Sequence, residues 1–223
     1  MDHREQIRTL IEQRRPLVVG AISESEGMTV TPIGCDVIEL RLDSLGTPEA
    51  VQNYAASSPL PVLLTARGNL EGGQSDWTFE ERAEAFRTLL SHAALIDIEL
   101  RDFEFLDEVI EEAREAGVTV VGSFHDFEKT PPAEELLDQL HPMADLHKFA
   151  LMAQSPKDIT SHLSLATGLA ERPFAVMGMG PLGAAARPLM ASCGSLLNYG
   201  YLGRTPTAPN QWPAKLLAET LFL

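Results

Sequence analysis

The chain has 223 residues, of which 44% are apolar and 22% charged, and its formal net charge at pH 7 is −15. This composition is typical of a globular protein, and since no apolar run reaches 18 residues, we expect no transmembrane helix. The acidic balance argues against nucleic acid and anionic membranes as partners, and it fits either a salt-adapted surface or an ordinary acidic cytosolic protein.

The chain alternates strand-like and helix-like segments after a short charged helix within residues 1–15. This N-terminus lacks the apolar stretch of a signal peptide, so we expect a cytoplasmic protein. Short runs rich in Val, Ile and Leu predict buried parallel strands at 17–22, 36–41, 61–66, 95–100, 118–123, 147–152, 174–179 and 195–200. Helical patterns lie between most of them, most clearly at 78–92, 103–116, 132–140, 156–170 and 213–222.

Eight strands alternating with helices, without a break in composition, predict a single (β/α)₈ barrel domain over residues 1–223. The alternative is an open doubly wound sheet, which usually carries a glycine-rich phosphate loop after its first strand. The turn at this place, ISESEGMTVTP, has one glycine, so the dinucleotide motif is absent. Because residues 23–35 contain two glycines and a proline, we expect the first outer helix to be short or missing.

The two cysteines, Cys35 and Cys193, lie far apart in the sequence. In a chain without an export signal, such a pair predicts reduced thiols rather than a disulfide. Neither cysteine has a histidine close to it in the sequence, so the spacing of metal ligands is missing as well. We therefore expect no metal site.

Polar side chains recur at the C-terminal ends of the predicted strands, where catalytic groups of such barrels lie. They are Glu39 and Arg41, Arg67, Asp97 and Glu99, Ser123 and His125, and Lys148. Because side chains alternate along a strand, the members of each pair share one face. Taken singly, a Glu/Arg pair is as often a plain ion pair, and a histidine after a strand is more often structural. Their coincidence on five strands favours a catalytic site at one mouth of the barrel.

Lys148 lies inside an apolar strand-like segment, LHKFALMAQ at 146–154. A charged ammonium is not left alone in an apolar lining, so this lysine is either paired, with Glu99 as a candidate partner, or reactive. By alternation, three apolar residues share its face and help to keep the amine neutral: Leu146, Ala150 and Met152. The neighbouring His147 points to the helix layer by the same rule. The remaining histidines outside the site fall in helices or termini and are expected at the solvent: His3, His92, His141 and His162.

Eight segments together resemble the type I 3-dehydroquinate dehydratase family. They are ELRLD at 39–43, TARGNLEGG at 65–73, DIEL at 97–100, SFHDFEKTP at 123–131, HKFALMAQS at 147–155, MGMGPLGAAAR at 177–187, SLLNYG at 195–200 and TAPNQ at 207–211. The resemblance covers nearly the whole chain in order, and the fourth and fifth blocks are highly specific. It implies a (β/α)₈ barrel, often a homodimer, that converts 3-dehydroquinate to 3-dehydroshikimate in the shikimate pathway through a Schiff base, without a metal or organic cofactor.

The resemblance also implies residue roles. Lys148 matches the Schiff-base lysine, His125 the general acid and base, and Glu71 the acid that supports this histidine. The matching substrate-binding residues are Arg187 and Gln211 for the carboxylate, Thr207 in the same loop, Glu39, Arg41 and Arg67 for the hydroxyls, and Met179 and Tyr199 as walls beside the ring.

The loop at 207–211 departs from the common family pattern, Ser-x-Pro-Gly-Gln. Thr207 keeps the hydroxyl, and Asn210 is the next best residue to glycine for a left-handed backbone, so we expect the loop to close as a lid.

The residues alone leave two other functions open. A class I aldolase would share the strand-6 lysine, although the His125 block argues against it. A catalytically silent barrel that binds a metabolite or partner would not need both Lys148 and His125.

Overall fold

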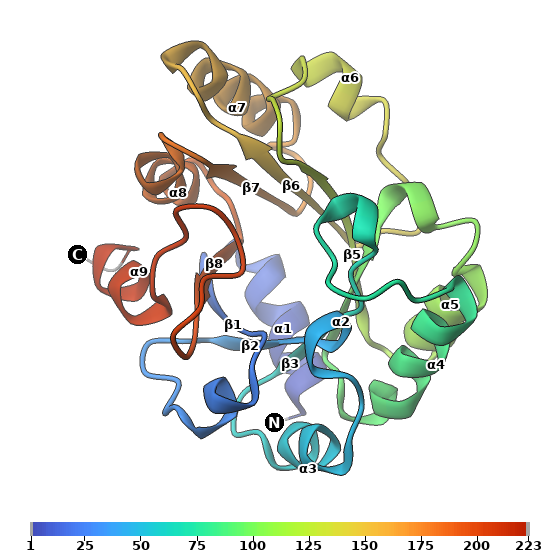
Figure 1. Cartoon of the computed structure of the whole chain (residues 1–223). Helices are drawn as coiled ribbons and strands as arrows, with labels where there is room; N and C mark the ends of the chain where they lie inside the picture. Colours follow the sequence, from blue (N-terminus) through green and yellow to red (C-terminus); the bar gives the residue numbers. More distant parts are fainter. Residues whose placement is uncertain (1, 222–223) are drawn as a thin grey trace.

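The eight predicted strands form one parallel sheet that is rolled into a nearly closed barrel (Figure 1). The structure, a computed structural model, describes residues 2–221. The strands are β1 (Leu17–Ile22), β2 (Val37–Arg41), β3 (Val62–Thr65), β4 (Leu95–Glu99), β5 (Thr119–Asp126), β6 (Leu146–Met152), β7 (Phe174–Met179) and β8 (Leu197–Tyr201). Their order is β7-β6-β5-β4-β3-β2-β1-β8, and at the seam Leu196 N donates to Phe174 O at 2.8 Å. The predicted (β/α)₈ barrel is therefore confirmed.

Helices surround the barrel in Figure 1. They are α1 (His3–Glu12), α2 (Leu42–Leu45), α3 (Glu49–Ser57), α4 (Phe79–Leu89), α5 (Asp107–Glu115), α6 (Ala133–Leu137), α7 (Pro156–Gly168), α8 (Gly183–Ser192) and α9 (Ala214–Leu221), with short 3₁₀ turns η1 (Ser25–Thr29), η2 (Asn69–Glu71), η3 (Leu90–His92) and η4 (Leu100–Asp102). The connection between β1 and β2 holds only the turn η1, so the prediction of a short or missing first helix is confirmed. Residue 222 of the predicted helix 213–222 lies outside the described residues.

Three helices, the four-residue α2 and the longer α3 and α8, were not among the clear helical patterns of the sequence. Helix α8 reads GAAARPLMAS, and its small residues and internal Pro188 blur the apolar period of a helix. Helix α3 buries only Val51 and Ala55, which leaves a narrow apolar stripe. Where helices start with a strong signal, the structure follows it. Thr78 and Glu81 form a capping box at the start of α4.

The barrel core has two faces with different contents. The inward face of β6 carries Leu146 and Ala150, which belong to an apolar cluster in the lumen. Its outward face carries Phe149 and Leu151, which pack in a cluster with helix residues. Ile7 of α1 joins the lumen cluster, so this helix closes the N-terminal end of the barrel. Strand alternation thus places Lys148 in the lumen, above an apolar floor.

The orientation of His147 agrees with the prediction from strand alternation, whereas the burial of His162 differs from the expected solvent exposure. His147 points out of the lumen, as predicted, and its Nε2 accepts a hydrogen bond from His141 N at 3.1 Å. His92 is exposed and His3 and His141 are half-buried, but His162 is fully buried in α7, so the prediction of solvent exposure was wrong there. Burial lowers the pKa of His162 to about 4.

His162 is buried because its ring contacts the loop that follows β5. Its Nε2 lies 3.0 Å from Thr130 Oγ1, and this hydroxyl donates to Met152 O at 2.7 Å. The loop after β5 is therefore tied both to α7 and to the end of β6. Periodicity alone could not identify this contact, because it depends on how the loop folds back.

Cys35 and Cys193 are both free, as the sequence predicts. Within residues 2–221, no helix combines the length and apolarity needed to cross a bilayer. The same described part of the chain contains no group of three or more His, Cys, Asp or Glu side chains arranged to hold a metal ion.

Candidate active site

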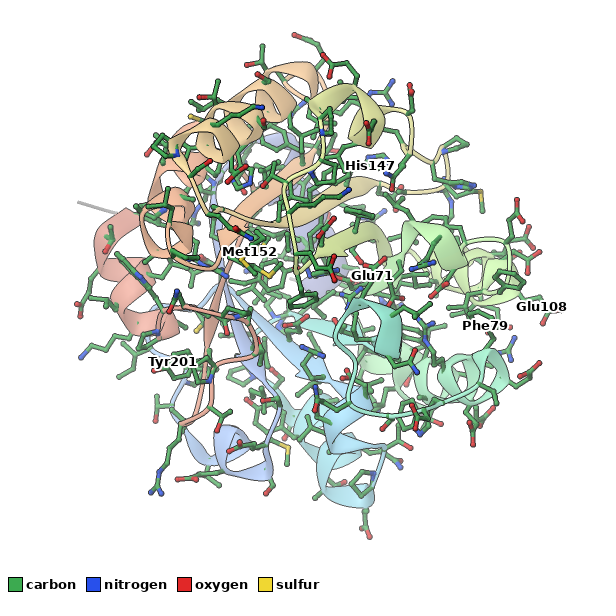
Figure 2. The ribbon with its side chains drawn as sticks, turned by 45° about the horizontal axis from the view of Figure 1, so that its top comes forward. Glu71, Phe79, Glu108, His147, Met152 and Tyr201 are labelled. Atoms are coloured by element: carbon green, nitrogen blue, oxygen red, sulfur yellow. The ribbon has the colours of Figure 1, made fainter. Side chains whose placement is uncertain are left out.

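The C-terminal ends of the strands surround a pocket that is lined by both charged and apolar side chains. All eleven site residues predicted from the sequence line it: Glu39, Arg41, Arg67, Glu71, His125, Lys148, Met179, Arg187, Tyr199, Thr207 and Gln211. Further lining residues are Gly72, Phe127, Ala150, Met177 and Ala208. Figure 2 shows Glu71 and Met152 near the middle of this end of the barrel, whereas Phe79 and Glu108 lie at its periphery.

Lys148 is buried in this pocket and is ion-paired. Its Nζ donates to Asp97 Oδ2 at 2.8 Å and lies 4.2 Å from the centroid of the Tyr199 ring. Burial lowers the pKa of Lys148, Asp97 opposes this effect, and Arg67 adds to it. The paired and the reactive interpretation are therefore compatible, since the ion pair holds the lysine in place while burial favours its neutral amine.

The expected partner Glu99 does not contact Lys148 and is held by other groups. Its carboxylate pairs with Arg82 of α4 and accepts from Gly68 N at 2.7 Å. Arg82 also binds Asp102 at 2.7 Å, so these ion pairs join α4 to the end of β4. Asp97 and Glu99 share a strand face, and the alternation rule could not decide which of them reaches the lysine.

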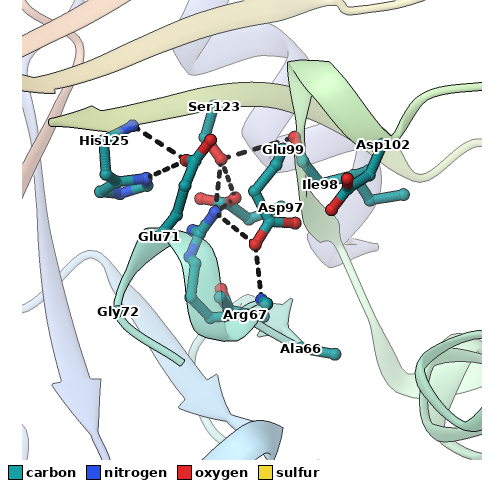
Figure 3. Close-up of polar contacts among 12 residues, drawn as sticks. Ala66, Arg67, Glu71, Gly72, Asp97, Ile98, Glu99, Asp102, Ser123 and His125 are labelled. Atoms are coloured by element: carbon teal, nitrogen blue, oxygen red, sulfur yellow. Dashed lines mark hydrogen bonds and ion pairs between the residues drawn. The ribbon is translucent and has the colours of Figure 1, made fainter. Parts of the chain in front are cut away.

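Asp97 is fully buried at the centre of a polar network (Figure 3). Its Oδ1 accepts from Arg67 Nη2 at 2.7 Å and from Ser123 Oγ at 2.6 Å, while Oδ2 accepts from Lys148. Although burial raises the pKa of Asp97, the charges of Arg67 and Lys148 outweigh it and hold this pKa well below its usual range. Asp97 is therefore a permanent carboxylate, and it was missing from the residues assigned to the site.

His125 is held by Glu71 from the loop after β3. Glu71 Oε2 lies 3.0 Å from His125 Nδ1 and also accepts the backbone N–H of His125 at 2.9 Å (Figure 3). Strand β5 runs three residues beyond the predicted end, so His125 stands on the strand itself. The carboxylate holds Nδ1, and the other ring nitrogen, Nε2, points away from it.

Burial keeps the pair of His125 and Glu71 close to neutral. It raises the pKa of Glu71 to about 8. It lowers the pKa of His125 well below its usual value, and the positive charges of Arg67 and Lys148 lower it further. Both shifts favour the uncharged forms of the two side chains, and an uncharged imidazole is able to accept a proton.

Arg187 of α8 is a buried cation that lacks an anionic partner. Its Nη1 donates to the backbone oxygen of Tyr199 at 2.9 Å, and within residues 2–221 no carboxylate pairs with it. Its Nε and the Tyr199 hydroxyl are buried without a hydrogen-bond partner. Burial lowers the pKa of Arg187 to about 10. A lone buried guanidinium of this kind is suited to bind a carboxylate.

Three side chains were expected to bind the hydroxyls of a ligand: Glu39, Arg41 and Arg67. Each of them has a hydrogen-bond partner within the protein. Thr65 Oγ1 donates to Glu39 Oε1 at 2.8 Å, and Arg41 binds Asp43 through two hydrogen bonds of 2.9 and 2.8 Å. These contacts fix the orientation of each side chain at the rim of the pocket.

The lid loop, residues 204–211, is folded over the pocket. Thr207 donates to Gln211 Oε1 from its backbone N at 2.7 Å and from its hydroxyl at 2.9 Å. Since Oε1 is occupied in this way, the amide nitrogen of Gln211 is left to donate to a ligand. Asn210 has a positive φ of 55°, as its family position predicts, and its Nδ2 donates to Gly180 O at 2.8 Å.

The Asn210 contact is expected to slow opening of the lid loop. The variant Asn210→Asp keeps the size of the side chain but places an oxygen against Gly180 O. One lost hydrogen bond contributes about 1 kcal/mol, which corresponds to a roughly fivefold faster opening. Amide hydrogen exchange of residues 204–211 measures this change. The matched control is Asn53→Asp on the exposed side of α3, and equal exchange in both variants would contradict the prediction.

Comparison with known proteins gives a consistent result. A model of the type I 3-dehydroquinase family matches residues 22–223. The chain is 34% identical over 211 residues to the 3-dehydroquinate dehydratase of Methanocella arvoryzae, covering 92% of this chain and 95% of that protein. It is 35% identical over 204 residues to the enzyme of the same name from Haloquadratum walsbyi, with 83% of each chain covered.

Two solved structures are similar in fold as well. The 3-dehydroquinate dehydratase of Geobacillus kaustophilus has a TM-score of 0.81 at 26% identity, covering 93% of this chain and 90% of that one. The type I 3-dehydroquinate dehydratase of Clostridium difficile, solved with covalently modified comenic acid, has a TM-score of 0.81 at 28% identity. It covers 93% of this chain and 91% of that one.

Proposed function

The chain belongs to the type I 3-dehydroquinase family and therefore dehydrates 3-dehydroquinate, and we propose that Lys148 and His125 perform this reaction. One observation supports this assignment above the others. A buried lysine, a histidine held by a carboxylate and an unpaired buried arginine line the same pocket. These are the groups that an imine, a proton transfer and a substrate carboxylate require.

The lysine is needed because the proton next to the substrate ketone is too weakly acidic to remove directly near neutral pH. The neutral amine of Lys148 attacks the ketone carbon, and the resulting carbinolamine loses the ketone oxygen as water. The product is a positively charged imine, which withdraws electrons from the neighbouring carbon. Burial of Lys148 favours the neutral amine that starts this sequence.

His125 moves the protons of the elimination. It takes a proton from the carbon next to the imine, and the electron pair of that C–H bond flows into an enamine. The enamine then expels the hydroxyl from the next carbon. The histidine returns its proton to this hydroxyl, which leaves as water. Water finally hydrolyses the imine, releasing 3-dehydroshikimate and the free amine. Glu71 is the positioning residue that keeps Nδ1 occupied and Nε2 toward the substrate.

Arg187 holds the substrate carboxylate, together with the free amide nitrogen of Gln211. Such charge-assisted contacts align the ring so that the proton to be removed faces His125. The hydroxyls of the substrate then face the rim of the pocket, where Glu39 and Arg41 stand. The lid loop excludes water while the imine persists.

Replacing Arg187 by methionine is expected to raise KM by about 100-fold with a smaller change in kcat, because charge-assisted hydrogen bonds contribute about 1.5–3 kcal/mol each. The melting temperature of the ligand-free variant should stay equal or rise, since a buried cation without an anion is removed. Steady-state kinetics and thermal unfolding measure both effects. An unchanged KM, or a strongly lowered melting temperature, would show that Arg187 is structural.

The activity itself is tested by adding 3-dehydroquinate and following the ultraviolet absorbance of the conjugated product. A steady rise supports the proposed function, and no rise with folded protein contradicts it. A class I aldolase would instead cleave a carbon–carbon bond and form no conjugated ring product. A silent binding protein would retain 3-dehydroquinate without any change in absorbance.

The homodimer that the family resemblance implies and the cytoplasmic location expected from the N-terminal sequence also belong to this proposal. Light scattering during gel filtration tests the dimer: twice the chain mass of 24.3 kDa is expected. A mass of one chain at micromolar concentration would contradict it.

A further inference from the structure

We propose that Asp97 is a catalytic residue of this reaction: it is the counterion that binds the protonated imine formed on Lys148. The inference deepens the proposed function and rests on it for the imine. The Asp97 side chain lies at the centre of the buried network, and its two carboxylate oxygens have different tasks.

The first task is to stay fixed. Asp97 Oδ1 accepts from Arg67 Nη2 and from Ser123 Oγ, and Arg67 Nη1 donates to the same Ser123 Oγ at 2.7 Å. This triangle of hydrogen bonds joins β4 and β5 to the segment that follows β3. It determines the orientation of the carboxylate and leaves Oδ2 directed at Lys148 Nζ, 2.8 Å away.

The second task follows from the chemistry at the lysine nitrogen. When the amine forms the imine, the nitrogen lone pair makes the bond to the ketone carbon, and the ketone oxygen leaves as water with two protons. The nitrogen keeps one hydrogen and a positive charge. That N–H lies where the ammonium now donates to Asp97 Oδ2, so one charge-assisted hydrogen bond replaces another.

The charge at this nitrogen changes during the reaction while the carboxylate does not. Proton removal converts the cationic imine to a neutral enamine, and expulsion of the hydroxyl restores the cation. In a buried site a lone cation is costly, and Asp97 stabilises each of the two cationic imines. The face of the Tyr199 ring, 4.2 Å from Nζ, adds a weaker attraction for the same charge.

Other charged groups face Lys148 from several elements, and none replaces Asp97. Glu39 on β2 is a second acid that acts on the lysine from a longer distance, and Arg67 acts in the opposite direction. His125 on β5 is close to neutral, as described above. Among the residues that the structure describes, Asp97 supplies the carboxylate that forms the ion pair with Lys148.

The test compares Asp97→Asn with Glu99→Gln. Both remove a buried carboxylate charge from β4 at nearly constant volume, and both carboxylates pair with Arg67, Glu99 at 3.4 Å. They differ at the lysine, because Glu99 binds Arg82 and Gly68 rather than Lys148. Asp97→Asn is expected to lower kcat by about 10- to 1000-fold, because an opposite charge at this distance shifts an ionisation by about 1–3 pK units. Glu99→Gln is expected to lower the melting temperature and to change kcat by less than about threefold, since the energy of its buried pair stabilises the fold.

A second measurement separates a counterion from a structural residue. Borohydride reduces the imine in the presence of 3-dehydroquinate, and the trapping rate is followed against pH. The carboxylate of Asp97 raises the pKa of Lys148, so its removal makes the amine available at lower pH. The acidic limb of the profile should therefore move to lower pH in Asp97→Asn and stay in place in Glu99→Gln.

Several outcomes would overturn the inference. They are a kcat within about threefold of the wild type in Asp97→Asn, an equal loss in both variants, or an acidic limb that does not move.

If wild-type protein turned over no 3-dehydroquinate and formed no adduct, the proposed function would fail first, and the counterion with it. If Asp97→Asn did not fold, Ser123→Ala would decide, because it frees one side of Asp97 and should lower kcat about fivefold at unchanged KM. An unchanged kcat in Ser123→Ala would then count against the proposal.

Discussion

Replacing Lys148 by methionine is expected to lower turnover of 3-dehydroquinate by at least about 10⁴-fold, because the variant has no amine to form the imine. The fold should survive the change. Methionine suits the apolar lining formed by Leu146 and Ala150, and Asp97 keeps its hydrogen bonds with Arg67 and Ser123. The product absorbance measures turnover, and circular dichroism measures folding.

The matched control is Lys157→Met, which removes an exposed lysine from α7. This control should keep the wild-type rate and form the same borohydride adduct. If Lys148→Met retained more than about one percent of the wild-type rate, the reaction would not pass through an imine on this lysine.

Replacing His125 by alanine has the second largest expected effect, with a different pattern. Loss of a general acid and base lowers turnover by about 10²- to 10⁴-fold. The lysine remains, so the imine still forms slowly and is not consumed. The fraction of protein trapped by borohydride during turnover should therefore equal or exceed that of the wild type, although product forms much more slowly.

The exposed His92 provides the control, since His92→Ala should change neither turnover nor trapping. A His125→Ala variant with a near-normal rate would contradict the acid–base assignment. A variant that is slow and also forms no adduct would show that His125 is required before the imine. In that case it would act mainly in the dehydration of the carbinolamine.

Much of the site could be predicted from the sequence because strand geometry is simple. The apolar run around Lys148 predicted a strand, and alternation placed the lysine in the lumen with Leu146 and Ala150. The family motifs then identified residues from several strands, two loops and helix α8 that line one pocket. Each of these steps depends on local pattern or on motif matching, and the structure brings the residues together as a barrel requires.

The remainder depends on three-dimensional detail that local patterns do not contain. Asp97 and Glu99 are equivalent by alternation, and only the position of Arg82 on α4 explains why Glu99 binds there instead of at the lysine. His162 falls on a helix that reads as amphipathic, and its burial depends on contact with Thr130 in a distant loop. In both cases a long-range partner decides the outcome.

The lid loop shows the same limit on a smaller scale. The sequence predicted that Asn210 would tolerate a left-handed backbone, and its φ of 55° agrees. The hydrogen bond from its side chain to Gly180 O could not be predicted, because it joins two loops that are 30 residues apart. A glycine at this position would supply the backbone shape without that contact.

The most direct test of the central claim is to reduce the protein with borohydride during turnover and to locate the adduct by peptide mass spectrometry. The chain has four lysines: Lys129, Lys148, Lys157 and Lys215. We predict inactivation that requires 3-dehydroquinate, with one adduct per chain on the peptide that contains Lys148. An active protein that carries no adduct, or carries it on one of the other three lysines, would contradict the claim that Lys148 is the covalent centre.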